Sequence, residues 1–111
     1  MKHIAVFDVG KTNKKLLVFD EQYRVVHELS KNFDEIKDED GFACENIEAV
    51  SEWIVHSFEE IINDNRFSIA AVNFSGYGAS FVHVDENGKA VLPLYNYLKP
   101  YSPVLQKQFY V

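Results

Sequence analysis

The sequence has a single cysteine, few prolines and glycines, and more acidic than basic residues. The lone cysteine, Cys44, excludes an internal disulfide framework and is typical of proteins from a reducing compartment such as the cytoplasm. A formal net charge of −6 argues against broad nucleic-acid binding, because phosphate backbones are neutralised by basic surfaces. No apolar run approaches the roughly 20 residues of a membrane-spanning helix, and the first residues do not form a secretion signal. We therefore expect a cytoplasmic protein that binds neither nucleic acid nor membrane.

Aromatic residues are abundant instead, with 9 phenylalanines and 6 tyrosines among 111 residues. This length suits one small domain with one core and is too short for two lobes. Residues 105–111 begin like an amphipathic helix that has no stop signal. We therefore expect the chain to be the first part of a longer protein. If many of the aromatic side chains are exposed, they would also suit a homodimer.

Apolar runs predict a sheet early in the chain. Residues 4–7 and 16–19 are continuous apolar runs, typical of strands buried on both faces, and residues 24–29 alternate like a third strand. Short polar turns between them favour an antiparallel meander. Another apolar run, residues 69–74, predicts a fourth strand. Residues 81–92 predict a hairpin, in which the pair Asn87-Gly88 favours a type I′ turn.

One helix is expected between the third and fourth strands. Asn46 is a suitable N-cap, and Trp53 is expected to pack from this helix onto the sheet. Apolar residues recur at helical steps after the cap, at Ile47, Val50, Ile54, Phe58 and Ile61. The acidic residues 33–41 are expected to form a solvated loop, with an acidic surface for a protein partner as the alternative.

The predicted order is thus β-β-β-α-β followed by a hairpin. A strand that returns over a helix to lie beside the first strand runs parallel to it, by the right-handed crossover rule. We therefore expect an α/β fold with a mixed sheet and a helix on one face. This is the arrangement of ribonuclease-H-like nucleotide-binding domains.

The turn formed by residues 8–15 (DVGKTNKK) is the strongest candidate site. Asp8 ends a buried strand and can hold hydrated Mg²⁺, and Gly10 lets the backbone come close to a ligand. Thr12 and Asn13 supply side-chain donors, and successive turn N–H groups can form an anion site. Three lysines add positive charge where phosphates would lie, namely Lys11, Lys14 and Lys15. The alternative is a plain hairpin whose lysines keep the sheet edge soluble.

The same residues carry a resemblance to a known family. Residues 8–20 (DVGKTNKKLLVFD) resemble the opening Asp-x-Gly-x-Thr-(Ser/Asn)-x-(Lys/Arg) motif of the FGGY carbohydrate kinases, within the superfamily of actin, hexokinase and Hsp70. Residues 69–76 (IAAVNFSG) look like the strand that ends in Ser-Gly or Thr-x-Gly in those kinases, and residues 81–93 look like the hairpin after it. The resemblance covers nearly all of this chain, which would be the N-terminal part of the first lobe of a two-lobed kinase.

This resemblance implies transfer of the γ-phosphate of ATP to a sugar hydroxyl, with ATP and Mg²⁺ as cofactors. It implies that Asp8 lies near Mg²⁺ and that the phosphates are lined by Gly10, Thr12, Asn13 and Lys15. Sugar contacts are implied in two segments, which contain Tyr77, Gly78 and Ala79 and, later, Tyr95, Asn96 and Tyr97. No catalytic residue is expected in this chain, because the resemblance places the general base after residue 111.

Two departures from the family pattern bear on the substrate. Many members carry Gln-x-His where this chain has residues 77–79 (YGA), and Trp-x-Asp-x-Arg where it has residues 95–99 (YNYLK). In the second departure Tyr97 replaces a carboxylate that would hydrogen-bond the sugar, which disfavours glycerol and xylulose. The first departure leans towards the rhamnulose- and fuculose-kinase branch or an uncharacterised substrate, although a xylulose-like ketose stays open. The alternative function is a non-catalytic sugar- or nucleotide-sensing domain of the same fold.

Overall fold

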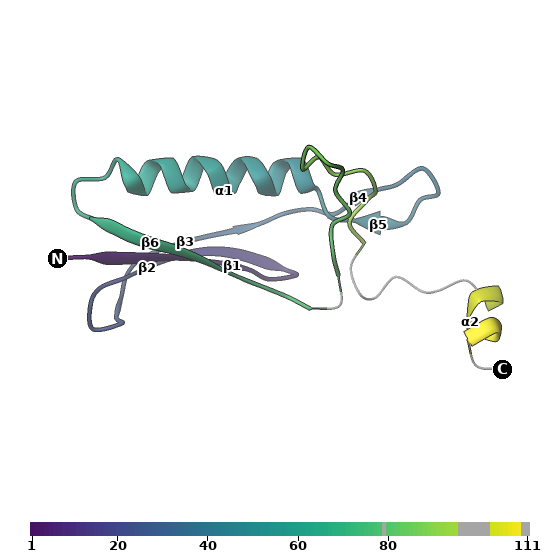
Figure 1. The fold of residues 1–111 in the computed structure, drawn as a ribbon, viewed down its shortest axis with the longest axis horizontal. Helices are drawn as coiled ribbons and strands as arrows, with labels where there is room; N and C mark the ends of the chain where they lie inside the picture. The colour runs from purple at the N-terminus through teal and green to yellow at the C-terminus, as the bar shows by residue number, and fades with distance from the viewer. Residues whose placement is uncertain (79, 96–102, 110–111) are drawn as a thin grey trace.

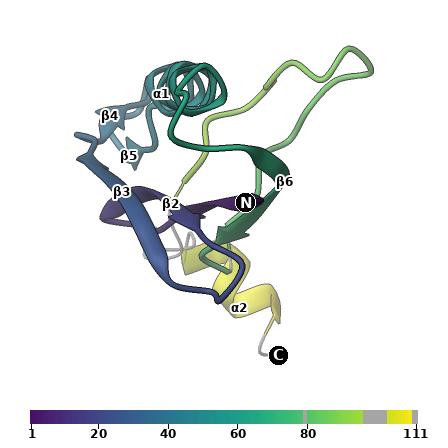
Figure 2. The same ribbon diagram turned by 90° about the vertical axis from the view of Figure 1, so that its left-hand side faces the viewer.

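The computed structural model describes residues 1–78, 80–95 and 103–109. A four-stranded sheet carries one long helix on one of its faces, as Figures 1 and 2 show from two sides. The sheet consists of β1 (His3–Val9), β2 (Asn13–Phe19), β3 (Val25–Asn32) and β6 (Ile69–Gly76), and the long helix is α1 (Ile47–Ile62). A small hairpin joins β4 (Ile36–Lys37) to β5 (Ala43–Cys44), and a short helix, α2 (Pro103–Phe109), comes last.

The strand order β3-β2-β1-β6 makes β1 a central strand. It pairs antiparallel with β2 and parallel with β6, so the sheet is mixed. The structure therefore confirms the predicted ribonuclease-H-like sheet with a helix on one face. β6 is one of the two edge strands, and its Val72 and Phe74 side chains are 41% and 57% exposed.

The core lies between α1 and the sheet. Alternate side chains of β1 and β2 point to the helix and are buried together with one helical residue, the set being Ala5, Phe7, Leu16, Val18 and Ile61. Trp53 packs edge-on against Phe7, with ring centroids 6.0 Å apart. The N-cap prediction is confirmed, because the Asn46 side chain accepts a hydrogen bond from the Ala49 N–H at 3.2 Å. Full burial of a large apolar side chain contributes about 1.5–3 kcal/mol, so this cluster is what holds the helix on the sheet.

The acidic residues 33–41 are mostly exposed, as expected of a solvated loop, but part of the stretch is paired as a strand. Ile36 and Lys37 pair with Cys44 and Ala43 as the β4–β5 hairpin. The carboxylate of Asp38 closes the hairpin turn by accepting the backbone N–H groups of Asp40 and Phe42. Strands of two residues are too short to give a period in the sequence, and here an acidic side chain holds the backbone together.

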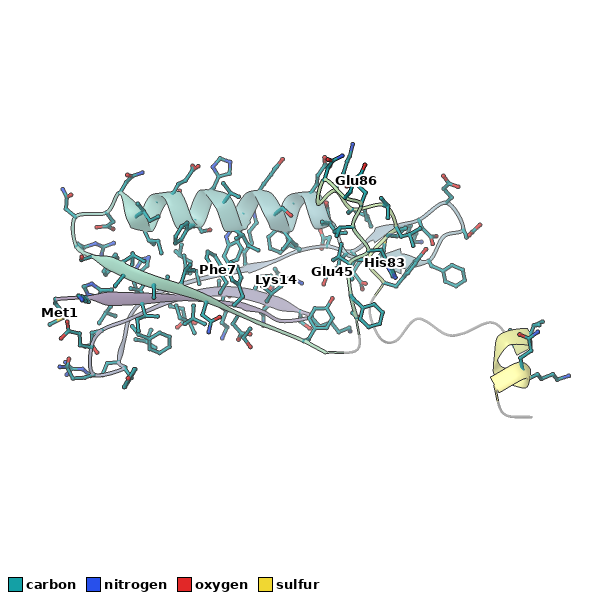
Figure 3. The ribbon with its side chains drawn as sticks, viewed as in Figure 1. Met1, Phe7, Lys14, Glu45, His83 and Glu86 are labelled. Carbon is teal, nitrogen blue, oxygen red and sulfur yellow. The ribbon has the colours of Figure 1, made fainter. Side chains whose placement is uncertain are left out.

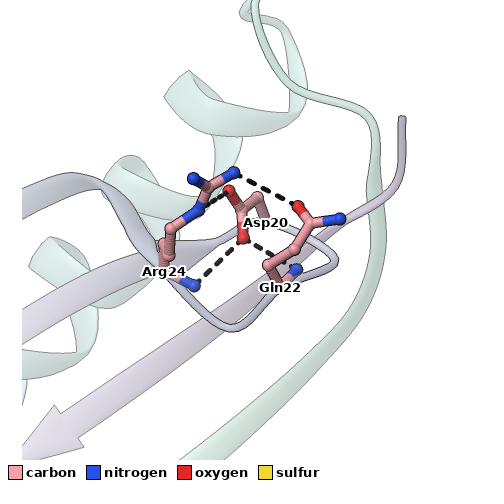
Figure 4. A network of polar contacts seen from close by, with 3 residues as sticks. All are labelled: Asp20, Gln22 and Arg24. Carbon is pink, nitrogen blue, oxygen red and sulfur yellow. Dashed lines mark hydrogen bonds and ion pairs between the residues drawn. The ribbon is translucent and has the colours of Figure 1, made fainter.

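The same turn occurs three times in the described part of the chain. In each case an aspartate accepts the N–H groups two and four residues later, and the residue between these two is left-handed. The turns begin at Asp20, Asp38 and Asp85, and their left-handed residues are Tyr23 (φ 61°), Gly41 (φ 85°) and Gly88 (φ 78°). Figure 4 shows the side-chain network of the first one.

The turn at Asp85 belongs to the hairpin predicted for residues 81–92. One bridge, Val84 to Ala90, forms there, and the Val91 N–H donates to the His83 carbonyl at 3.0 Å. The type I′ prediction is wrong, because Gly88 is left-handed and Asn87 is not. The Asp85 side chain stabilises a different turn by taking up the Asn87 and Lys89 N–H groups.

Neither described helix is both long and apolar enough to cross a lipid bilayer.

Candidate functional site

The β1–β2 turn stands at the end of the sheet with its polar side chains exposed. The Gly10 N–H donates to the Asn13 carbonyl at 3.0 Å and closes the turn. A Cβ atom at Gly10 would lie 2.7 Å from that same oxygen, so the turn itself demands glycine here. Thr12 and Asn13 are exposed, and within the described residues neither side chain makes a hydrogen bond. The tip of the turn therefore offers a hydroxyl and an amide to a ligand.

Strand register brings Asp8, Lys15 and Ser75 into one row. The exposed Asp8 lies opposite Lys15 on β2 and beside Ser75 on β6. The row lies on the face opposite α1, because successive side chains of a strand alternate between faces and Phe7, next to Asp8, is buried against the helix. Asp8 and Lys15 were predicted site residues, whereas Ser75 was missed because its place depends on the parallel register of β6.

Lys15 also contacts Glu28 on β3. The Lys15 Nζ lies 3.7 Å from the Glu28 Oε1, and the two side chains are 40% and 48% exposed. An exposed pair of this kind contributes at most about 1 kcal/mol. Lys15 can therefore turn to an anionic ligand at little cost.

Lys14 does not add its charge to this row, contrary to the prediction from sequence. Its side chain points to the helix side of the sheet and is 1% exposed, and Figure 3 places it beside Glu45. The Lys14 Nζ donates to the Glu45 Oε1 at 2.8 Å and to the Lys11 carbonyl at 3.0 Å. The correction follows from strand alternation, because Lys14 is in phase with the buried Leu16.

Tyr77, the first predicted sugar residue, lies directly after β6. Its N–H donates to the Val9 carbonyl at 3.3 Å, which extends the pairing of β6 with β1. Its hydroxyl donates to the Glu45 Oε1 at 2.9 Å, and its ring centroid lies 5.9 Å from the Lys14 Nζ. Gly78 is exposed, with no atom within 4 Å of an added Cβ, and Ala79 lies outside the described residues.

Tyr95, from the second predicted sugar segment, contacts the β4–β5 hairpin. Its hydroxyl donates to the Asp38 carboxylate, and this hydrogen bond raises the pKa of Tyr95 to about 12. The preceding residue, Leu94, accepts the Glu45 N–H at 2.7 Å. Asn96 and Tyr97 lie outside the described residues.

Glu45 was not predicted as a functional residue. It stands between a short strand and the helix cap, where one acidic residue carries no pattern and is usually exposed. In the structure it is 7% exposed and contacts the β1–β2 turn through Lys14 and the loop after β6 through Tyr77. Both predicted sugar segments are therefore bonded to the short stretch from Asp38 to Glu45.

Comparison with known families gives an assignment over most of the chain. Residues 3–99 match the FGGY family of carbohydrate kinases, N-terminal domain. The chain belongs to this family. The match confirms the resemblance that the Asp8 turn and the strand before Ser75 carry. No curated protein has a sequence that matches this FGGY chain closely enough to count as a relative.

Solved structures of kinases share the fold of this FGGY chain. A carbohydrate kinase from Novosphingobium aromaticivorans has a TM-score of 0.84 and 14% identity, covering 96% of this chain and 22% of its own. Plasmodium falciparum glycerol kinase with ADP has a TM-score of 0.77 and 16% identity, covering 99% of this chain and 23% of its own. Ligand-bound xylulose kinase from Lactobacillus acidophilus has a TM-score of 0.71 and 21% identity, covering 86% of this chain and 19% of its own. This chain thus spans between 19% and 23% of their length, and the likeness establishes the fold.

Proposed function

We propose that this chain is the N-terminal part of the first lobe of a sugar kinase that transfers the γ-phosphate of ATP to a ketose hydroxyl. The observation that carries the proposal is the row of Asp8, Lys15 and Ser75 beside the exposed β1–β2 turn. A carboxylate, a positive charge and exposed donors in one place suit a magnesium nucleotide. Membership of a carbohydrate kinase family supports the same chemistry.

Asp8 fits a magnesium ion that is held mainly by a nucleotide. Mg²⁺ in such sites takes one or two carboxylates and keeps several waters, and Asp8 is exposed at the end of its strand. Within the described residues, no three His, Cys, Asp or Glu side chains gather as a metal cage. When bound, the ion would neutralise charge on the phosphates.

The remaining phosphate contacts are assigned to the turn. Thr12 and Asn13 donate to phosphate oxygens, and Lys15 supplies a positive charge after leaving Glu28. Gly10 keeps the turn tight, so that the backbone N–H groups at the tip of the turn can face one ligand. In phosphoryl transfer such positioning and charge stabilisation do most of the catalysis, so loss of one of these groups slows turnover.

The proposal is tested with the full-length protein, ATP, Mg²⁺ and a panel of ketoses that includes rhamnulose, fuculose and xylulose. We expect one ketose to stimulate ADP release, and Asp8→Asn to lower kcat/KM by about 100-fold or more, the range for a group that stabilises transition-state charge. Asp34→Asn, at an exposed aspartate outside the row, is the matched control and should leave the rate unchanged. Equal losses in both variants would contradict the role of Asp8.

The sugar is proposed from the loop after β6. The solved relatives are named as kinases of different compounds, xylulose and glycerol among them. Residues 77–79 (YGA) stand where many members of the family carry Gln-x-His, and this departure favours a ketose of the rhamnulose or fuculose kind. If calorimetry detects sugar or nucleotide binding while no ketose stimulates ADP release, the protein is a sensing domain instead.

A further inference from the structure

Glu45 connects its own segment of the chain to three others through hydrogen bonds. Its backbone N–H donates to the Leu94 carbonyl at 2.7 Å. Its Oε1 accepts two hydrogen bonds, one from the Lys14 Nζ at 2.8 Å and one from the Tyr77 hydroxyl at 2.9 Å. Lys14 belongs to β2 just after the phosphate turn, and Tyr77 begins the loop after β6. One carboxylate oxygen therefore joins the two parts of the proposed site.

The position of this oxygen is fixed by the helix. Glu45 directly precedes Asn46, the N-cap of α1, and its backbone forms a bridge with Leu94. Lys14 and Glu45 are 1% and 7% exposed, so water does not screen their attraction. The Lys14 ammonium is held in addition by the Lys11 carbonyl, inside the turn itself. A rigid acceptor thus binds both the turn and the loop.

We propose that Glu45 is a positioning residue that fixes the loop after β6 against the phosphate turn by holding Tyr77 and Lys14 through one oxygen. The role of that loop in sugar binding rests on the proposed function, whereas the link itself does not. Tyr77 then acts through its hydroxyl as the anchor of the loop that begins with it. A displacement of Lys14 is transmitted to Tyr77, although Lys14 lies on β2 and Tyr77 lies in the loop after β6.

Hydrogen–deuterium exchange of the full-length protein tests the link without any ligand. In Lys14→Met, we expect peptides that cover residues 74–84 to exchange about tenfold faster or more, the factor for one lost hydrogen bond to a charged group, while α1 keeps its protection. Lys31→Met is the matched control, because Lys31 is exposed on β3 directly opposite Lys14. Unchanged exchange in residues 74–84, or equal acceleration over the whole chain, would overturn the proposal.

Variants of Glu45 separate the link from simple packing. Glu45→Ala removes the acceptor, so residues 74–84 should exchange as fast as in Lys14→Met. Glu45→Gln keeps an oxygen at the same place and should restore part of the protection. If the two variants exchange alike, Glu45 does not act as the acceptor for Tyr77 and the proposal is wrong.

Tyr77→Phe removes one hydroxyl and tests the consequence for the site even if the Lys14 variant fails to fold. We expect the KM for the ketose substrate to rise about tenfold and the KM for ATP to stay within about twofold. Tyr23→Phe, at an exposed tyrosine, is the control. An unchanged KM for the ketose, or an equal rise for both substrates, would contradict positioning of the sugar loop. If the wild-type protein phosphorylates no ketose, the proposed function fails, and the exchange experiment still decides the link.

Discussion

Two turns join the first three strands, and they are built in opposite ways. The turn at Asp20 uses its polar groups on itself, because the carboxylate accepts the Gln22 and Arg24 N–H groups at 2.9 and 3.0 Å and the Arg24 guanidinium at 3.0 Å (Figure 4). The turn at Gly10 is closed by one backbone hydrogen bond and leaves Thr12 and Asn13 exposed. Its support comes from the buried Lys14 behind it.

The difference separates a turn that connects from a turn that can bind. A turn that satisfies its own N–H groups with its own side chains has few groups left for a ligand. A turn that keeps them outward must be held from another element, and Lys14 and Glu45 do this for the turn at Gly10. The four predictions below test this comparison, from the largest expected effect to the smallest.

Removal of Lys14, which holds the turn at Gly10 from behind, should have the largest effect on stability. Lys14→Met should lower the free energy of unfolding by about 3 kcal/mol, because it leaves the buried Glu45 carboxylate without its cationic partner. Arg24→Met removes the cation of the second turn, which is 73% exposed, and should cost less than about 1 kcal/mol. Urea denaturation measures both. Equal losses would erase the distinction between the turns, and Lys14→Met combined with Glu45→Met should recover much of the stability.

Loss of the tight closure of the turn at Gly10 should have the next largest effect on stability. Gly10→Ala puts a methyl group 2.7 Å from the Asn13 carbonyl oxygen and should cost about 1–3 kcal/mol by forcing the backbone apart. Gly76→Ala is the control, since no atom lies within 4 Å of its added Cβ, and it should stay within about 0.5 kcal/mol. Thermal unfolding measures the two variants side by side. A neutral Gly10→Ala would mean that the turn is looser than its geometry indicates.

The second turn should gain stability from one substitution. Tyr23 is left-handed at φ 61°, where its two counterparts in the chain are glycines. A left-handed residue with a side chain costs about 1–2 kcal/mol, and a glycine would remove this cost. Glycine also gives the unfolded chain more conformational freedom, which lowers the stability by about 0.5–1 kcal/mol. Tyr23→Gly should therefore stabilise by roughly 0.5–1 kcal/mol in urea, and Tyr23→Phe by nothing. A loss of stability in Tyr23→Gly would show that the 78% exposed tyrosine makes a contact that matters.

Acid should act on the second turn. The Arg24 N–H, with further hydrogen bonds from Gln22 and the Arg24 side chain, holds the pKa of Asp20 below its ordinary value of 3.8. A carboxyl group with a lowered pKa stabilises the folded state at pH values above its ordinary pKa. This contribution is lost as the pH falls through the pKa of the folded state. Asp20→Asn should flatten the fall of Tm between about pH 4 and pH 2. Part of the fall should remain, because Arg66 lowers the pKa of Asp64 to about 2.

Much of the fold could be predicted from the sequence. The four strands, the helix, its Asn46 cap and the parallel return of β6 follow from apolar periods, capping and the crossover rule. The β4–β5 hairpin could not be predicted, because its strands are two residues long and its turn depends on the side chain of Asp38. The turn type at Asp85 was missed for the same reason, since the pair Asn87-Gly88 is the stronger local signal.

The candidate site was predictable in part. Asp8 and the residues of the Gly10 turn stand out by type, and the turn is where they were expected. The orientation of the two lysines after it was not decidable, because residues 16–19 are all apolar and fit the core in either phase. One phase buries Lys14, and the other would have buried Lys15. Glu45 was beyond reach, since its partners come from segments far away in the sequence.

The place of β1 in the sheet also bears on how the chain folds. Its first neighbour, β2, follows after a tight turn, whereas its second neighbour begins only at Ile69. During synthesis the first three strands can pair as soon as Asn32 has emerged, while the other edge of β1 keeps its N–H and C=O groups unpaired. We expect the closure of β6 on β1 to be the slow step, because it must overcome the entropy of a long loop before any contact repays it. Until α1 has formed and brought β6 back, β1 is the part of this protein most exposed to pairing with another chain.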